Sequence, residues 1–189
     1  MFRVPALVAL LLSSPAVADP VPAAPEPASY RCRLTFEAGL GLGWIHVAAD
    51  GISETGDLGL SGPNLGIGGW VSGKLAITGR IAGVSHSHRG IRVTNTVIGA
   101  AAQYWIDDRY WLGGGLGLGL LVLTGSSFDS SQDNVTAGFG FDLRAGFAFS
   151  QTREHVFNLS LEVTPTLLSN GGERARYTGI ALQFGYQHL

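Results

Sequence analysis

Residues 135–149 read VTAGFGFDLRAGFAF, and every second residue of this stretch is apolar. The residues between them are small or polar, and they include Asp142 and Arg144. A period of two predicts a β-strand, because successive strand side chains point to opposite faces of a sheet. Globular strands usually have about 5 to 6 residues, whereas a tilted strand needs roughly 9 to 11 residues to cross a bilayer. The length of this stretch therefore favours a membrane-spanning strand.

The same alternation recurs along most of the chain after residue 31. Seven further segments show it, the first four clearly and the last three weakly: 34–44, 112–122, 157–164, 179–187, 64–71, 75–84 and 93–105. The chain ends on a strand, and an unpaired final strand would be costly unless the sheet closed on itself. We therefore predict an all-β fold, an eight-stranded antiparallel up-and-down transmembrane β-barrel.

The connections between the predicted strands alternate in length. Short ones lie at 72–74, 107–109 and 151–153, and long polar ones near 48–62, 85–92, 124–134 and 165–176. Short turns on one side and long loops on the other are typical of outer-membrane barrels. With eight strands, both ends of the chain lie on the short-turn side, so we expect the N- and C-termini in the periplasm.

The glycine-rich face of the strands is predicted to line the lumen. Rows such as Gly113 to Gly119 would expose backbone without solubilising a water-facing exterior. Eight strands leave an interior just wide enough for side chains, so we expect a filled lumen rather than an open pore. Five charged residues fall on this inner face, where opposite charges could pair: Glu37, Arg80, Asp142, Arg144 and Glu162.

Aromatic side chains are expected where the hydrocarbon meets the headgroups. Trp44 and Tyr177 would mark the rim near the long loops. A larger group clusters near the short turns: Trp70, Tyr104, Trp105, Tyr110, Trp111, Phe157 and Tyr186.

Residues 1–18 predict a cleavable signal peptide, with Arg3, an apolar stretch over 4–12 and an Ala-Val-Ala exit at 16–18. The apolar stretch is well below the roughly 20 residues that a spanning helix needs. Residues 19–31 are rich in Pro and Ala and predict an extended periplasmic linker, which leaves 32–189 for the barrel. Cys32 is the only cysteine, so we expect a free thiol and no intrachain disulfide.

The charge balance argues against nucleic-acid binding. Without Arg3, 11 of the 12 Lys and Arg residues remain against 14 Asp and Glu, and they form no basic block. No apolar run after the signal peptide reaches about 18 residues, which argues against a helical membrane protein. The glycine runs at 39–43 and 113–119 lack the following helix that phosphate binding requires, so we expect no cofactor.

Ser85-His86-Ser87-His88-Arg89 is the segment whose side chains are best suited to catalysis or metal binding. Two imidazoles two residues apart could share a metal, or one could activate a serine. The segment falls in a predicted loop, however, with no acid beside it and no third metal ligand at a suitable spacing. We therefore assign no catalytic, cofactor or metal residue, and interpret these histidines as exposed loop residues. Histidines at strand ends are interpreted as interfacial: His46, His155 and His188.

These patterns resemble the small eight-stranded outer-membrane barrels of Gram-negative bacteria, of the outer-membrane protein A and X type, over roughly 32–189. The most specific motif is Gly-Ile-Ala-Leu-Gln-Phe at 179–184, which is similar to the Gly-x-x-hydrophobic-x-aromatic signal of the barrel assembly machinery. Two departures stand beside it: Tyr177 replaces a more polar residue of the family, and five residues, 185–189, follow in place of a terminal aromatic.

The resemblance implies a Gram-negative outer-membrane location, among outer-membrane lipids and lipopolysaccharide. It also implies insertion by the barrel assembly machinery after escort by periplasmic chaperones. We expect a monomer with a structural or loop-mediated surface-interaction role and no enzymatic activity. Two alternatives stay open. One is a lipid A-modifying enzyme of the deacylase or acyltransferase type, using His86 or His88 with Ser85 or Ser87; the other is a narrow solute channel.

Overall fold

The computed structural model describes residues 34–49, 52–56, 58–88, 90–125, 134–170 and 173–189. The predicted signal peptide, the linker and Cys32 lie outside these residues. The described ranges form nine β-strands: β1 (Leu34–Ala49), β2 (Ile52–Thr55), β3 (Gly59–Trp70), β4 (Leu75–His88), β5 (Ile91–Trp105), β6 (Tyr110–Gly125), β7 (Asn134–Gln151), β8 (His155–Asn170) and β9 (Glu173–His188). No helix within them is long and apolar enough to cross a membrane.

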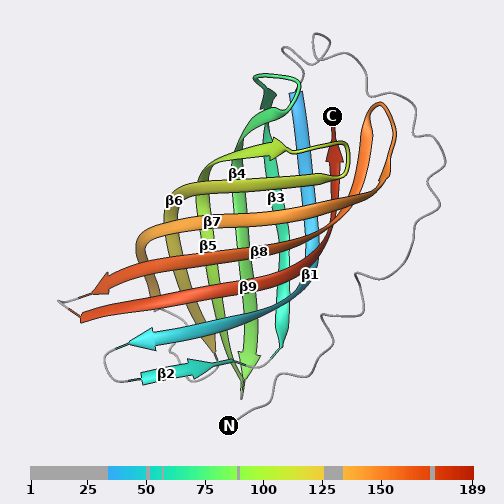
Figure 1. The fold of residues 1–189 in the computed structure, drawn as a ribbon. Coiled ribbons are helices and arrows are strands. Elements are labelled where there is room, and N and C mark those ends of the chain that lie inside the picture. Colours follow the sequence, from blue (N-terminus) through green and yellow to red (C-terminus); the bar gives the residue numbers. More distant parts are fainter. Residues whose placement is uncertain (1–33, 50–51, 57, 89, 126–133, 171–172) are drawn as a thin grey trace.

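Eight of the strands close into an antiparallel barrel (Figure 1). Strands β1 and β3 to β9 pair in sequence order, and β9 pairs back with β1 from Phe36 opposite His188 to Ala49 opposite Ala175. The short β2 pairs only with the end of β1. Closure removes the free edge that a bilayer would leave without hydrogen-bond partners. The predicted eight-stranded barrel is confirmed.

The two ends of the barrel differ. Tight turns follow β3, β5 and β7 at one end, and a backbone hydrogen bond of 2.8 or 2.9 Å closes each of them. The C-terminus lies at this same end (Figure 1), where the amide of Leu189 donates to the carbonyl of Glu154 at 2.9 Å. We call this the short-turn end and the opposite one the long-loop end.

Strands extend further toward the long-loop end than the sequence predicted. The segments 85–92 and 165–176 were expected to be long loops, but β4 continues to His88, and β8 continues to Asn170. Barrel strands of 12 to 18 residues exceed the roughly 9 to 11 that a crossing needs, so β-structure continues past the membrane. The prediction failed because the period of two in hydropathy breaks in these extensions: residues 85–88 are polar on both faces, and the adjacent Leu167 and Leu168 place apolar side chains on opposite faces. Loop predictions at 50–51, 57 and 126–133 fall outside the described residues.

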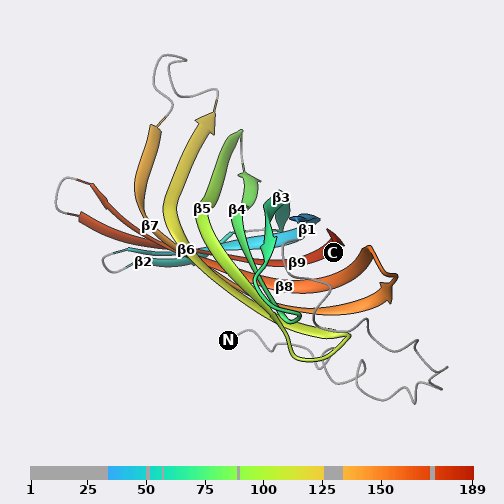
Figure 2. The same ribbon diagram turned by 90° about the horizontal axis from the view of Figure 1, so that it is seen from above.

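The wall divides into two groups of strands at the long-loop end. Pairing of β6 with β7 reaches Leu123 opposite Asn134, whereas pairing of β7 with β8 reaches only Gly138 opposite Leu168. Figure 2 shows the ends of β4 to β7 pointing away from those of β8, β9 and β1. The barrel therefore presents two separate strand groups beyond its closed part.

The two faces of the wall carry the residues that the alternation predicted. Outward positions such as Leu118, Phe139 and Leu182 are apolar and exposed, while the alternate positions hold glycine, buried polar side chains or buried apolar ones. Lumen glycines make room for large neighbours: a Cβ on Gly66 would overlap the carboxylate of Glu37, and one on Gly146 would overlap the indole of Trp111.

Candidate functional site

Five charged side chains meet in the lumen: Glu37 of β1, Arg80 of β4, Asp142 and Arg144 of β7, and Glu162 of β8. Arg80 contacts all three carboxylates. Its Nε donates to Asp142 Oδ2 at 2.8 Å, its Nη1 lies 3.0 Å from Glu37 Oε1, and its Nη2 donates to Glu162 Oε2. Arg144 Nη1 donates to Glu37 Oε2 at 2.6 Å. The predicted pairing of these inner-face charges is confirmed, and we call the five residues the lumen charge network.

Neutral side chains extend the lumen charge network to β3 and β9. Asn64 Nδ2 and Gln183 Nε2 donate to Glu162 Oε1 at 2.7 and 2.9 Å, and both also lie within hydrogen-bond distance of Ser61 Oγ. The Glu162 carboxylate therefore receives donors on both oxygens. Sequence reasoning missed these neutral residues, because neutral polar side chains recur along every strand of the inner face and nothing local distinguishes them.

A small cavity lies beside the lumen charge network. Three carboxylates face two guanidinium groups, which gives a formal charge of −1. Beside Asp142 and Arg80 the wall leaves a cavity of about 10 Å³, bordered also by Val97 and Ala101. That volume is room for about one water molecule, which could hydrogen-bond to Asp142 Oδ1, an oxygen with no protein partner.

Apolar clusters lie on both sides of the lumen charge network. The cluster at the short-turn end consists of Trp70, Ala76, Trp105, Trp111, Ala148, Val156 and Leu189. The cluster at the long-loop end consists of Ile45, Val84 and Ala181, with Val47, Val93 and Tyr177 packed against them. Charged side chains are thus enclosed between two apolar layers.

The tryptophans correct the prediction of a lipid-facing aromatic belt. Trp70, Trp105 and Trp111 are only 5, 6 and 3% exposed and point into the lumen. Trp105 lies opposite Trp111 in the β5–β6 register, and the guanidinium carbon of Arg144 is 5.2 Å from the Trp111 ring centroid. Tyr177, expected at the rim, likewise packs inward. Proximity to a turn tells how far along the barrel axis a side chain lies. Whether it faces the lumen or the lipid depends on its odd or even position in the strand.

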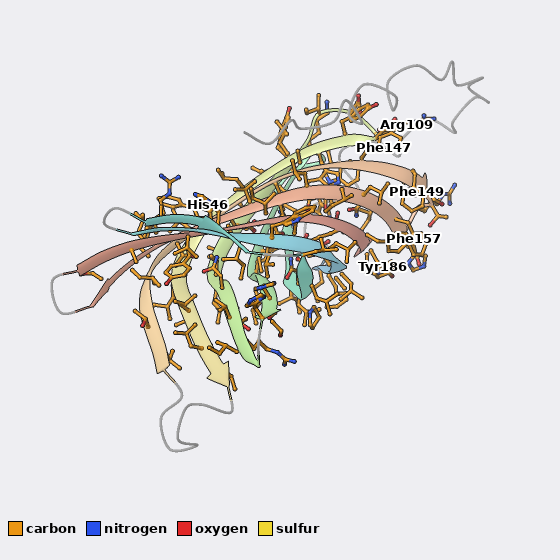
Figure 3. The ribbon with its side chains drawn as sticks, turned by 90° about the horizontal axis from the view of Figure 1, so that it is seen from below. His46, Arg109, Phe147, Phe149, Phe157 and Tyr186 are labelled. Atoms are coloured by element: carbon orange, nitrogen blue, oxygen red, sulfur yellow. The ribbon has the colours of Figure 1, made fainter. Side chains whose placement is uncertain are left out.

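A lipid-facing aromatic group does exist at the short-turn end, over β6 to β9. Figure 3 shows Phe147, Phe149, Phe157 and Tyr186 on this side of the barrel, with Arg109 beside Phe147. The Phe157 and Tyr186 ring centroids are 5.5 Å apart, and His155 Nδ1 lies 2.8 Å from the Tyr186 hydroxyl. Such an aromatic belt is what a headgroup boundary requires.

The structure does not bring the serines and histidines of segment 85–88 together. These residues belong to β4, not to a loop. Ser85 points outward and its Oγ lies 2.8 Å from Thr94 Oγ1, whereas His86 is buried on the inner face, where its ring stacks with His88 at a centroid distance of 6.3 Å. Ser87 is outward and lies 3.4 Å from Arg92 Nε. Among the described residues, no group of three His, Cys, Asp or Glu could hold a metal ion.

Comparison with known proteins agrees with this geometry. The family described as outer membrane protein beta-barrel domain matches residues 4–187. The chain belongs to this family. Its members are outer-membrane proteins, and the protein is accordingly an outer-membrane β-barrel.

Solved barrels share the fold at low sequence identity. Neisserial surface protein A has 14% identity and a TM-score of 0.57, with 81% of this chain and 96% of that chain covered. The attachment invasion locus protein Ail of Yersinia pestis has 17% identity and a TM-score of 0.48, with 80% and 97% covered. OprG of Pseudomonas aeruginosa has 12% identity and a TM-score of 0.43, with 84% and 96% covered. Such identities show the fold alone. No curated protein matches the chain.

The outer wall of this outer-membrane barrel becomes polar toward the long-loop end. On β1 and β9 the change follows Trp44, which lies opposite Ile180; the next outward residues are His46 opposite Thr178 and Ala48 opposite Arg176. On β5 it begins at Thr96 and Thr94 and reaches Arg92. Every ionisable outward side chain described at this end is basic: His46, Arg92 and Arg176.

Proposed function

We propose that this protein is a non-conducting, non-enzymatic integral outer-membrane barrel that acts at the cell surface through its long-loop end. The observation that supports the proposal is the filled lumen, in which the lumen charge network lies between two apolar clusters. The barrel then serves as a support, and the interacting residues lie on the strand extensions and their connections.

The lumen charge network argues against the channel alternative. Arg80 of β4 joins carboxylates from β1, β7 and β8, so a path for solutes would require these pairs to separate. Breaking a buried ion pair costs about 3 to 5 kcal/mol, because one charge is left without compensation. Two apolar layers would still obstruct the same path.

The proposed orientation places the long-loop end outside the cell and both termini in the periplasm. Short turns and the C-terminus share one end of the molecule, and short turns are periplasmic in bacterial barrels. The name of Neisserial surface protein A describes that barrel as a surface protein, which supports the same role for the present long-loop end.

The proposed partners follow from the outer surface. Outer-membrane lipids and lipopolysaccharide would cover the apolar outward rows, and a monomer would suffice, since lipid can cover them on every side. The barrel assembly machinery would recognise β9, whose Ile180, Leu182 and Phe184 all face outward. Periplasmic chaperones would escort the unfolded chain, and nucleic acid has no role.

Opposite strand faces argue against the lipid A-modifying alternative. A nucleophile and its base must lie within hydrogen-bond reach of each other. Ser85 and Ser87 point outward while His86 and His88 point inward, so the sheet itself separates them.

The proposal is tested by conductance and by labelling from outside the cell. In a Cys32→Ser background, Ser169→Cys at the long-loop end should react with an impermeant maleimide on intact cells. Asp108→Cys in the turn after β5 should not react until the cells are lysed. The purified barrel should show no current steps in planar bilayers, and its expression should leave the lipid A mass spectrum unchanged. Discrete currents, a new lipid A species or labelling of residue 108 on intact cells would contradict the proposal.

A further inference from the structure

A pair of histidines lies on the outer wall at the short-turn end, where β8 begins and β9 ends. His155 and His188 are directly opposite each other in the β8–β9 register, and their ring centroids are 5.5 Å apart. The next outward pair on the same strands is Phe157 opposite Tyr186, which belongs to the lipid-facing aromatic group (Figure 3). The two imidazoles therefore lie one step beyond the aromatic group, toward the aqueous phase.

The spacing of the two rings suits a shared metal ion. Residues directly opposite on antiparallel strands have Cβ atoms about 4.5 to 5.5 Å apart, so their side chains meet on the same face. Zinc lies about 2.0 to 2.1 Å from a histidine nitrogen, and two imidazoles on one tetrahedral ion have ring centres about 5 Å apart. The observed 5.5 Å is close to this separation. Rotation of the two side chains, without movement of the strands, would bring both rings onto one ion.

Tyr186 supplies a contact that orients one of the rings. Its hydroxyl lies 2.8 Å from Nδ1 of His155, and the two rings stack at a centroid distance of 5.9 Å. When the Nδ1–H donates to this hydroxyl, Nε2 carries the lone pair that a metal requires. A histidine that binds a metal usually donates its other N–H in this way, which fixes the tautomer and the ring orientation. The Tyr186 hydroxyl can therefore hold His155 in the form that a metal ligand needs.

The donor atoms select the class of metal. Imidazole nitrogen suits Cu²⁺, Ni²⁺ and Zn²⁺, whereas Mg²⁺ and Ca²⁺ prefer oxygen ligands. Affinity at such sites rises along the first-row divalent metals to Cu²⁺ and falls again at Zn²⁺. The described residues bring no third His, Cys, Asp or Glu to the pair, so water would complete the coordination. We therefore expect weaker binding than at a structural zinc site with four protein ligands.

We propose that His155 and His188 form a two-imidazole binding site for a divalent transition-metal ion, with Cu²⁺ bound most tightly and Tyr186 as a positioning residue. The ion joins β8 to β9 at the edge of the aqueous phase. Because the two ligands come together only when these strands pair, metal binding stabilises the folded barrel. The site is independent of the proposed surface role and of the compartment that the short-turn end faces.

Copper titration of the refolded barrel in neutral detergent, read by pulsed EPR, tests the site in a Cys32→Ser background. Pulsed EPR counts the imidazoles bound to Cu²⁺, and the unmodified barrel should show two. His155→Gln and His188→Gln should each leave at most one. Each should weaken binding by more than about 100-fold, beyond the usual 10- to 100-fold cost of losing a hydrogen bond to a metal-bound histidine. His46→Gln and His86→Gln, changes at the long-loop end, are the controls and should bind copper like the unmodified barrel.

Tyr186→Phe tests the positioning role separately. It keeps the aromatic ring and removes the hydroxyl, so copper binding should weaken by about tenfold while both imidazoles stay coordinated. Unchanged affinity in this variant would refute the role of Tyr186.

Four results would overturn the site itself: fewer than two imidazoles on copper in the unmodified barrel, unchanged binding by His155→Gln or His188→Gln, an equal loss with either control, or displacement of copper by equimolar Mg²⁺. Heat-modifiable gel mobility shows whether each variant is folded. The imidazole count of the unmodified barrel decides the question even where a variant fails to fold.

Discussion

Replacing Arg80 with Met is expected to lower the free energy of unfolding by about 3 to 5 kcal/mol, the cost of breaking a buried ion pair by removing one partner. Arg80 is only 8% exposed, and in the described part of the lumen it is the sole guanidinium that forms an ion pair with Asp142 or Glu162. Methionine keeps an unbranched apolar chain in the same space, so the change tests charge more than volume.

The size of the effect follows from the charge count. The lumen charge network has a formal charge of −1 with both arginines and −2 without Arg80, because Arg144 pairs only with Glu37. Glu162 keeps the amide donors of Asn64 and Gln183 when Arg80 is removed. The expected loss of unfolding free energy therefore stays within the range for a single buried ion pair, although Arg80 contacts three carboxylates. Adding Asp142→Asn and Glu162→Gln to Arg80→Met restores neutrality and should recover most of the loss.

Urea unfolding in lipid vesicles measures the effect. Tryptophan fluorescence suits the assay, because three of the four tryptophans are packed in the lumen. Arg109→Met, an exposed surface change, is the control and should stay within about 0.5 kcal/mol of the unmodified barrel. The reasoning is refuted if Arg80→Met also stays within that limit, or if the neutral triple variant is no more stable than Arg80→Met.

Three other changes probe the outer face, the short-turn cluster and a turn. Leu118→Arg, at a 50% exposed lipid-facing position near the middle of β6, should lower the free energy of unfolding by about 2 to 4 kcal/mol in vesicle titrations. Gly117→Arg should give no heat-modifiable band, because even a Cβ there would overlap the Ile98 carbonyl. Trp111→Ala should cost about 3 to 5 kcal/mol without producing current steps in planar bilayers, since the lumen charge network stays in place. Backbone amides of the turn donate to the Asp107 carboxylate and lower its pKa in the folded protein. Asp107 therefore stabilises the fold fully at pH values above its pKa in the unfolded chain, and this contribution is lost as pH falls through its lower pKa in the folded protein. An NMR titration midpoint at or above the ordinary aspartate value would contradict this.

Strand identity and face could be predicted from sequence because the bilayer acts on each strand separately. Leu116 and Leu118 face lipid and Gly117 faces the lumen whatever the neighbouring strands do, so a period of two is sufficient information. The inner-face location of Arg80 and Glu162 follows from the same parity. No long-range contact had to be known for either result.

Partners across the lumen could not be predicted, because they depend on register and on barrel closure. Arg80 and Asp142 are 62 residues apart in sequence, and Asn64 and Glu162 are 98 apart. Local sequence also misplaced Trp105 and Trp111. Both stand next to a turn, where a lipid-facing belt was expected, but each is one residue away from the outward tyrosines Tyr104 and Tyr110.

The filled lumen and the lipid-facing wall together restrict where this protein can meet a partner. Residues that face the lumen are committed to the charge network and its apolar clusters, and residues that face the hydrocarbon are committed to lipid. The outward side chains of the strand extensions beyond Trp44, Ser85 and Thr94 are under neither constraint, yet the strands that carry them remain hydrogen-bonded β-structure. A bilayer crossing does not require these extra residues, and holding polar strands in order outside the membrane costs conformational entropy. The surface-interaction role that we propose would account for them, because rigid strands present side chains in a fixed arrangement.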